Sequence, residues 1–364
     1  FQALTGQSTC DDANPGYFVN STGSSVQNEC EIGSYQPNSA QSSCIDATPG
    51  NYVDTPASVS QTPCTPGTYN PNSSSNASSA CLDADLGSYV SQFGSSSQTT
   101  ASPGYYVDTT GSPGQIPCSP GSYNPDAGSN NSSACLTADL GYYVSQSGRA
   151  TQTAASSGYY VDSTGASTQT PCSPGRYNPW PASTSETACL FADMGHYVSQ
   201  SGSPSQTPAS PGHYVDTTGA TSQIACLPGT YNPASASDDA SACIDAEFGH
   251  YVSASGRSSQ TPASTGHYVD AVGATSQTPC QAGTYNPSTA STSSANCLPA
   301  DSGYKAPNTG MGNQIACSPG TYQPNSGQLS CLDSDLGNYV SGSGHIDQIP
   351  CPAGTYSNVT AATS

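Results

Sequence analysis

Positively charged side chains are scarce in this sequence. Its 364 residues include only 4 Lys and Arg against 24 Asp and Glu, so the formal net charge is −20. A surface this poor in cations cannot neutralise nucleic-acid phosphates or bind anionic lipid headgroups. We therefore expect no nucleic-acid partner and no binding to anionic membrane surfaces. Solubility must come from Ser, Thr, Asn, Gln and scattered carboxylates.

Large apolar side chains are scarce as well. The sequence has 5 Phe, 2 Met and 1 Trp, and its hydrophobic share of 33% includes 23 Tyr and 16 Cys. No apolar run approaches the roughly 18 residues of a membrane span, so we expect no membrane insertion. No stretch shows the apolar period of a helix with caps. These absences predict an all-β and coil chain without a large shared core.

Sequence signatures of catalysis are also missing. There is no nucleophile elbow, phosphate-binding loop or HExxH pattern. Four of the five histidines occupy one position of a repeat that other copies fill with Ser, Tyr, Asn, Thr or Arg, which is typical of an exposed strand site. We therefore expect no catalytic residue, no cofactor and no enzymatic activity. The histidines are His196, His213, His250, His267 and His345.

Pairs of acidic residues recur, and oxygen-rich loops can bind calcium. Other copies of the same segment have a single acid, and the EF-hand spacing is absent. The sequence therefore favours a solvated or turn role for these residues and no metal site. The pairs are Asp83 with Asp85, Asp245 with Glu247, and Asp333 with Asp335.

What the chain does contain is a short repeat. A Gly-x-Tyr phrase or a close variant begins at twenty glycines, spaced by 17 or 20 residues. A fixed short period indicates one small unit repeated along the chain, and such units contact mainly their neighbours. We therefore expect an elongated rod of β-hairpin-like repeats. The repeat glycines are Gly16, Gly33, Gly50, Gly67, Gly87, Gly104, Gly121, Gly141, Gly158, Gly175, Gly195, Gly212, Gly229, Gly249, Gly266, Gly283, Gly303, Gly320, Gly337 and Gly354.

The repeats sort into three types by cysteine position. An early Cys lies three residues before its glycine, a late Cys lies six residues before, and bare repeats have neither. Their order predicts three regions: residues 1–63 with a 34-residue period, residues 64–296 with a 54-residue period, and residues 297–364 with a 34-residue period.

Each repeat has the composition of a β-hairpin. In residues 158–175, Tyr-Tyr-Val favours a strand, Asp-Ser-Thr-Gly a turn, and Ser-Thr-Gln-Thr a second strand. A single hairpin is marginally stable in water, so it must be held by its neighbours and by disulfides. The recurring tyrosine rings are the expected core, with a sugar-binding platform as the alternative role.

Two disulfide schemes are compatible with the repeat. If each late Cys pairs with the next early Cys, every bare repeat would separate the two partners. Their Cα atoms would then lie farther apart than a disulfide allows. Pairing each early Cys with the next late Cys closes loops of only 14 or 17 residues and is favoured. It joins Cys30–Cys44, Cys64–Cys81, Cys118–Cys135, Cys172–Cys189, Cys226–Cys243, Cys280–Cys297 and Cys317–Cys331. In the chain-entropy model each bond stabilises the folded state by about 3 kcal/mol relative to the unfolded chain.

The favoured scheme leaves Cys10 and Cys351 without partners. Cys10 is a late Cys and Cys351 is an early one, so each is the half that the other needs. An intersubunit disulfide between them would make a head-to-tail homopolymer. Two alternatives remain open: the second scheme, in which all cysteines pair internally, and a chain that is part of a longer polypeptide.

The cysteines and the sequons both indicate an extracellular protein, secreted or at the cell surface. Six Asn-x-Ser/Thr sequons are candidate sites for covalent glycans. They begin at Asn20, Asn72, Asn76, Asn130, Asn131 and Asn358.

One family resembles part of this pattern. The phrases Cys64-Thr-Pro-Gly-Thr-Tyr, Cys226-Leu-Pro-Gly-Thr-Tyr and Cys351-Pro-Ala-Gly-Thr-Tyr are similar to the Cys-Pro-Pro-Gly-Thr-Tyr signature of ephrin-receptor-like cysteine-rich repeats. That family occurs in receptor ectodomains and in tandem arrays on protist and algal surface proteins. The resemblance covers the eight repeats with an early Cys and implies a disulfide-bonded β module outside the cell.

The expected function is that of a structural protomer of a glycosylated extracellular filament or appendage, and the alternative is the stalk or binding ectodomain of a receptor or adhesin.

Overall fold

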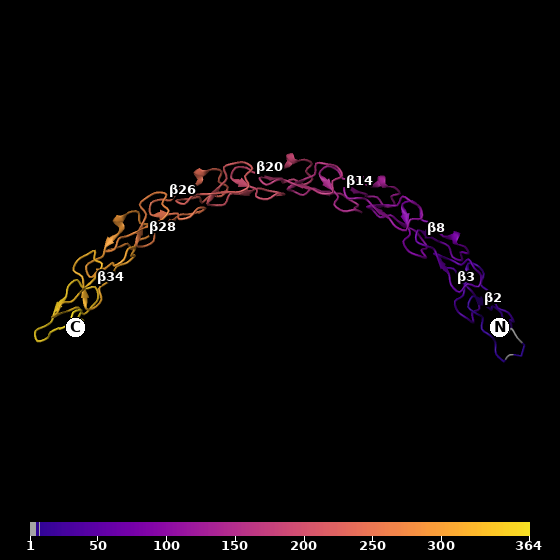
Figure 1. The fold of residues 1–364 in the computed structure, drawn as a ribbon, viewed down its shortest axis with the longest axis horizontal. Coiled ribbons are helices and arrows are strands. Elements are labelled where there is room, and N and C mark those ends of the chain that lie inside the picture. The colour runs from indigo at the N-terminus through magenta and orange to yellow at the C-terminus, as the bar shows by residue number, and fades with distance from the viewer. Residues whose placement is uncertain (1–4, 7) are drawn as a thin grey trace. The chain divides into compact units, whose positions relative to one another are not determined.

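The computed structural model describes residues 5, 6 and 8–364, which form two-stranded antiparallel hairpins joined by coil. These residues divide into two compact units, one of residues 1–172 with 178–188 and one of residues 173–177 with 189–364. Within each unit the hairpins follow one another in the order of the sequence (Figure 1). The expected fold class, repeated β-hairpins stapled by disulfides, is confirmed. The boundary between the units lies inside residues 64–296, and the three regions of different period stay a prediction.

A tight turn begins each hairpin. In the repeat of Gly67, the amide of Thr68 donates to the carbonyl of Thr65 at 3.0 Å, and Gly67 has a φ of +92°. Pro66 precedes this glycine, as in a type II turn, where proline fits the second position and glycine the third. The two residues after the glycine then form the first strand, and the second strand precedes the next turn.

Seven hairpins are closed by a disulfide, and we call them disulfide hairpins. They pair β3 (Ser34–Tyr35) with β4 (Ile45–Asp46), β7 (Thr68–Tyr69) with β8 (Leu82–Asp83), β13 (Ser122–Tyr123) with β14 (Leu136–Thr137), β19 (Arg176–Tyr177) with β20 (Leu190–Phe191), β25 (Thr230–Tyr231) with β26 (Ile244–Asp245), β31 (Thr284–Tyr285) with β32 (Leu298–Pro299), and β35 (Thr321–Tyr322) with β36 (Leu332–Asp333).

The other hairpins of the described residues have no disulfide, and we call them open hairpins. They pair β1 (Tyr17–Phe18) with β2 (Asn28–Glu29), β5 (Asn51–Tyr52) with β6 (Thr62–Pro63), β9 (Ser88–Tyr89) with β10 (Thr99–Thr100), β11 (Tyr105–Tyr106) with β12 (Ile116–Pro117), β15 (Tyr142–Tyr143) with β16 (Thr153–Ala154), β17 (Tyr159–Tyr160) with β18 (Thr170–Pro171), β21 (His196–Tyr197) with β22 (Thr207–Pro208), β23 (His213–Tyr214) with β24 (Ile224–Ala225), β27 (His250–Tyr251) with β28 (Thr261–Pro262), β29 (His267–Tyr268) with β30 (Thr278–Pro279), β33 (Tyr304–Lys305) with β34 (Ile315–Ala316), and β37 (Asn338–Tyr339) with β38 (Ile349–Pro350).

The longer disulfide hairpins each contain one 3-10 turn in the loop before the late Cys. Four of these turns are followed directly by a late Cys that caps the last turn through its backbone amide, as Cys81 does. The turns are η1 (Ser78–Ala80), η2 (Ser132–Ala134), η3 (Glu186–Ala188), η4 (Ala240–Ala242) and η5 (Ser294–Asn296).

The core consists of two small residues per repeat. Three residues before every repeat glycine except Gly354 lies a buried Ala or Cys, replaced once by Ser334, and three residues after it usually lies a buried Val or Asn. Ala84 is 0% exposed and Val90 is 2% exposed. The tyrosines of the strands are only half-buried, so the expectation that their rings form the core is wrong. Ala, Cys, Val and Asn fill the buried positions instead.

Backbone hydrogen bonds join each repeat to the next. The amide of Gly67 donates to the carbonyl of Val90 at 2.7 Å, and the amide of Val90 donates to the carbonyl of Ser112 at 3.1 Å. The loop after β11 also bonds to the preceding repeat, because the amide of Gly111 donates to the carbonyl of Ala84 at 2.8 Å. This pattern satisfies peptide groups that two-residue strands alone would leave without partners.

The repeat glycines are required by packing against the second repeat along the chain. A Cβ at Gly121 would overlap the carbonyl oxygen of Gly165, and a Cβ at Gly104 would overlap that of Gly148. Both Gly121 and Gly104 also have positive φ, at +84° and +90°, which side chains disfavour. The recurring glycine therefore reflects both the turn and a close contact between backbones.

Candidate functional sites: hairpin closures, free thiols and sequons

The disulfides follow the scheme in which each early Cys pairs with the next late Cys. Their Cα–Cα distances are 5.6–5.8 Å, within the usual range. Cys172 and Cys189 are also disulfide-bonded. The other bonds are Cys30–Cys44, Cys64–Cys81, Cys118–Cys135, Cys226–Cys243, Cys280–Cys297 and Cys317–Cys331. Each bond connects the residue before the turn with the residue before the second strand.

The open hairpins are closed at the same place by a glutamine. In the repeat of Gly104, Gln115 stands directly before the second strand, and its Oε1 accepts from the amide of Ser102 at 2.7 Å. Ala101 occupies the position of the early Cys and is 0% exposed. Sequence reasoning missed this role, although aligning the repeats on their glycines places Gln where the late Cys stands. The glutamines are Gln27, Gln61, Gln98, Gln115, Gln152, Gln169, Gln206, Gln223, Gln260, Gln277, Gln314 and Gln348.

The same closure explains many of the recurring acids. Gln98 accepts from the amide of Asp85 at 2.7 Å, and its Nε2 donates to Asp85 Oδ2 at 2.7 Å. Glu247 receives the equivalent bond from Gln260 at 3.2 Å. Among the residues that the structure describes, no three His, Cys, Asp or Glu side chains gather as a metal site would require. These carboxylates therefore complete a hairpin closure.

Buried amides organise the disulfide hairpins and were also missed. Asn70 is 0% exposed, and its Nδ2 donates to the carbonyl of Asn51 at 2.9 Å and to Ser75 Oγ at 2.8 Å. Its Oδ1 accepts from the amide of Asn72 at 3.1 Å. In two hairpins with the shorter, 14-residue disulfide loop, the longer glutamines Gln36 and Gln323 take this role. The sequence signal is the recurring Gly-x-Tyr-Asn-Pro or Gly-x-Tyr-Gln-Pro.

Two cysteines remain free, and they are the two that the favoured scheme leaves over. Cys10 is exposed, and Cys351 is partly exposed. Cys10 lines a surface hollow of about 380 Å³ together with Ser21 and Thr22, which belong to the Asn20 sequon. Both thiols are therefore accessible to solvent.

All six sequons lie at the surface. Asn72 and Asn76 lie in the loop between β7 and β8, Asn130 and Asn131 lie in the loop between β13 and β14, Asn20 follows β1, and Asn358 follows β38; each is exposed. The Asn131 side chain also caps η2 by accepting from the amide of Ser133 at 2.9 Å. These positions are accessible to a glycosylating enzyme.

The histidines lie on the strands and loops where the repeat places them. Four form the first residue of a strand, and the ring of His213, for example, contacts the nearby carbonyl of Pro211 at 3.3 Å.

One tyrosine has a perturbed acidity: burial first, and then the nearby carboxylates of Glu186 and Asp162, raise the pKa of Tyr160. Neither arrangement brings a nucleophile and a base together.

No protein-family model matches the chain, and no curated protein matches it. Within the described part of the chain, no helix has the length and apolar character needed to span a membrane. Fourteen cysteines are disulfide-bonded, a density typical of proteins that fold in an oxidising compartment. The chain is therefore a cysteine-rich tandem-repeat protein of extracellular or secreted type.

Proposed function

We propose that this protein is the structural protomer of a glycosylated extracellular filament or cell-surface appendage. One observation carries the proposal: Cys10 and Cys351 are free, and they are of complementary type. A bond from Cys351 of one molecule to Cys10 of the next would repeat the early-to-late pairing found within the chain. Such a contact is head to tail, and head-to-tail contacts produce filaments unless they close into a ring.

Within the chain, loops pack on earlier repeat glycines: a Cβ at Gly320, for example, would overlap the carbonyl of Ala361. In a head-to-tail polymer, the loops of a second copy would continue this packing. The partner is this same chain, and covalent glycans at the exposed sequons would coat its surface.

Non-reducing electrophoresis of the oxidised protein tests the proposal. We expect a ladder of multiples of the 36.6 kDa chain, plus glycan, which collapses to one band on reduction. The variants Cys10→Ser and Cys351→Ser should each remain monomeric alone. Mixing the two should yield only a dimer, because one free Cys351 then meets one free Cys10.

The variants also separate head-to-tail from like-to-like pairing. If Cys10→Ser alone dimerises through Cys351, the contact is symmetric and no filament follows. A single monomeric band from the unmodified protein would refute covalent polymerisation. Electron microscopy of the same sample should show uniform fibres that shorten to single molecules in either variant.

The second candidate is the stalk or ectodomain of a surface receptor or adhesin. The resemblance of Cys64-Thr-Pro-Gly-Thr-Tyr to ephrin-receptor-like repeats favours it, as do surface clefts that recur along the chain. In this case the native material would contain isolated single molecules and no fibres. Microscopy therefore distinguishes the two candidates directly.

A further inference from the structure

A surface cleft recurs between an open hairpin and the disulfide hairpin that follows it. Three such clefts have volumes of about 300, 220 and 220 Å³. Each is lined by the strand tyrosine of the open hairpin, the residue before the early Cys, the residue after it, the middle residue of Gly-x-Tyr, the first residue of the 3-10 turn, and the late Cys. The tyrosines are Tyr52, Tyr214 and Tyr268.

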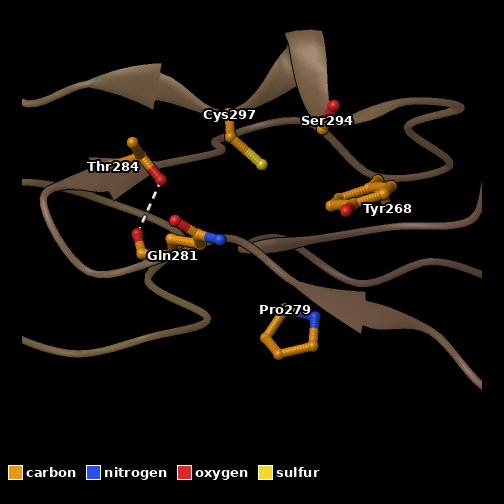
Figure 2. A pocket seen from close by; sticks show the side chains of 6 residues that line it. All are labelled: Tyr268, Pro279, Gln281, Thr284, Ser294 and Cys297. Carbon is orange, nitrogen blue, oxygen red and sulfur yellow. Dashed lines mark hydrogen bonds between the residues drawn. The ribbon is translucent and has the colours of Figure 1, made fainter.

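Figure 2 shows the cleft of Tyr268. The Tyr268 ring and the sulfur of Cys297 face the same space between two hairpins, with Pro279 below and Ser294 above. Thr284 closes the far side, and its hydroxyl donates to the carbonyl of Gln281 at 2.7 Å. The Cys280–Cys297 disulfide holds this side of the cleft in place.

The same positions approach each other in a further repeat. Glu186 begins η3, as Ser294 begins η5. Its carboxylate is close enough to Tyr160 to raise the pKa of that phenol, after the larger effect of burial. The strand tyrosine and the first residue of the next 3-10 turn thus line one cleft in three repeats and interact electrostatically in a fourth.

We propose that these clefts bind neutral sugar rings. The C–H face of a pyranose carries partial positive charge and stacks on the negative face of an aromatic ring such as Tyr268. In the cleft of Tyr268 the remaining lining supplies a few polar groups around an apolar floor: the hydroxyls of Thr284 and Ser294 and the amide of Gln281. The hydroxyls of Thr65, Thr68 and Ser78 line the cleft of Tyr52, and the hydroxyl of Thr230 lines that of Tyr214. That combination, in a preformed hollow, is the usual chemistry of a small-ligand site.

Charge selects a neutral ligand over an anionic one. The clefts of Tyr52, Tyr214 and Tyr268 have no charged lining residue, whereas the equivalent hollow beside Phe18 is lined by Glu29 and Glu31 and is not part of the proposed site. The chain as a whole carries a formal net charge of −20, which repels anions approaching from solution. Acidic polysaccharides are therefore disfavoured, and neutral hexose oligomers are favoured.

A saturation-transfer NMR experiment on the full chain, enzymatically freed of its own glycans, tests the proposal. The probes are a neutral hexose oligomer and an acidic uronic-acid oligomer of the same length. We expect signal transfer to the neutral oligomer only. Equal transfer to the acidic oligomer, or none to either, would overturn the proposal. Recovery of binding only after deglycosylation would show that the protein's own glycans occupy the clefts.

Matched variants identify the site. The triple variant Tyr52→Ala, Tyr214→Ala and Tyr268→Ala should lose more than half of the transfer. The control changes the tyrosines at the same register position in open hairpins that are followed by another open hairpin, where no disulfide forms a cleft wall. This control triple, Tyr89→Ala, Tyr197→Ala and Tyr251→Ala, should retain the signal. Equal loss in both triples would show that the tyrosines act only structurally.

A second set of variants covers the case in which removal of the tyrosines disrupts folding. Ser78, Ala240 and Ser294 are exposed and line the three clefts from the 3-10 turns. Replacing each with Leu fills the cleft from the surface without touching the strand pairing. Binding should fall with all disulfides intact by mass spectrometry, and unchanged binding would refute the site. Neither outcome depends on whether the chain polymerises.

Discussion

Disulfide hairpins and open hairpins have the same fold but different closures. Both have two-residue strands, a repeat glycine with positive φ and a buried small residue before the turn. Cys226 is 1% exposed in a disulfide hairpin, and Ala209 is 0% exposed in the preceding open one. The disulfide hairpin then joins Cys226 to Cys243 covalently, whereas Gln223 bonds to the amide of Ser210 at 2.8 Å.

The comparison shows that hydrogen bonds and packing between repeats form the hairpin and that the closure only strengthens it. Both classes make the same backbone bonds to neighbouring repeats: the amide of Gly229 donates to Val252 and the amide of Gly212 donates to Asn232. If the disulfide were essential for the shape, the strands of the open hairpins would pair differently. In both classes the tyrosine that ends the first strand pairs with the first residue of the second strand.

The largest effect is expected from changes that both classes should share. Gly121→Ala in a disulfide hairpin and Gly104→Ala in an open one should each cost about 3 kcal/mol or more of local stability, from a disfavoured φ plus an overlap with backbone. Hydrogen exchange of the neighbouring amides measures this. Gly114→Ala, where a Cβ would meet nothing within 4 Å, is the control. A loss confined to one class would contradict the shared packing.

Next in size is conversion of one class into the other. The double variant Cys226→Ala and Cys243→Gln should keep its hairpin and lose about 3 kcal/mol of local stability in the chain-entropy model of a 17-residue loop. Exchange of the Thr230 and Ile244 amides reports it. Complete unfolding of this repeat would show that the disulfide, and not packing, forms the hairpin.

The reverse conversion should stabilise. Ala209 and Gln223 stand 14 residues apart at the positions that Cys30 and Cys44 occupy in a disulfide hairpin. The double variant Ala209→Cys and Gln223→Cys should therefore form a disulfide on oxidation, stabilising its hairpin by about 3 kcal/mol. Peptide mapping of the oxidised variant checks this. Two free thiols at these positions would show that the two classes differ in backbone geometry.

A smaller effect is expected from removing a glutamine closure. Gln206 accepts from the amide of Asp193 at 2.7 Å and donates to its carboxylate at 2.8 Å. Gln206→Leu should cost about 1 kcal/mol of local stability, the usual net value of such bonds. Gln200→Leu is the matched control, because Gln200 takes part in its loop through the backbone carbonyl, which accepts from the Ser203 hydroxyl. Equal losses would indicate a general propensity effect.

The smallest effect is a pH dependence confined to one disulfide hairpin. Hydrogen bonds from the hydroxyl and the amide of Ser241 lower the pKa of Asp239, which caps η4. A lowered pKa means that this stabilisation is present above the usual pKa of an aspartate and is lost as the pH falls through the lowered value. An NMR titration should show it, and Asp239→Asn should remove it. Asn131 caps η2 without a titratable group, so η2 should show no such change.

Much of the fold followed from spacing. The regular spacing of the repeat glycines from Gly16 to Gly354 indicated repeated hairpins. Pairing each early Cys with the next late Cys was favoured because no bare repeat then separates the two partners. The tyrosines were misjudged because composition reports which rings are available and not how closely backbones approach. Gln115 and Asn70 were missed because amides are frequent in this chain, and their roles depend on contacts 13 to 19 residues away.

The sequence by itself determined the period and the turn at each repeat glycine, and it favoured the cysteine pairing that leaves Cys10 and Cys351 over, because all of these depend on residue type at fixed spacing. Only the tertiary structure decided that Ala, Cys, Val and Asn form the core and that Gln closes the open hairpins. It also decided that a tyrosine and a disulfide face each other across a recurring cleft. The physical reason is that these features arise where one repeat meets the next, and the distance between neighbouring backbones is a property of the packed array.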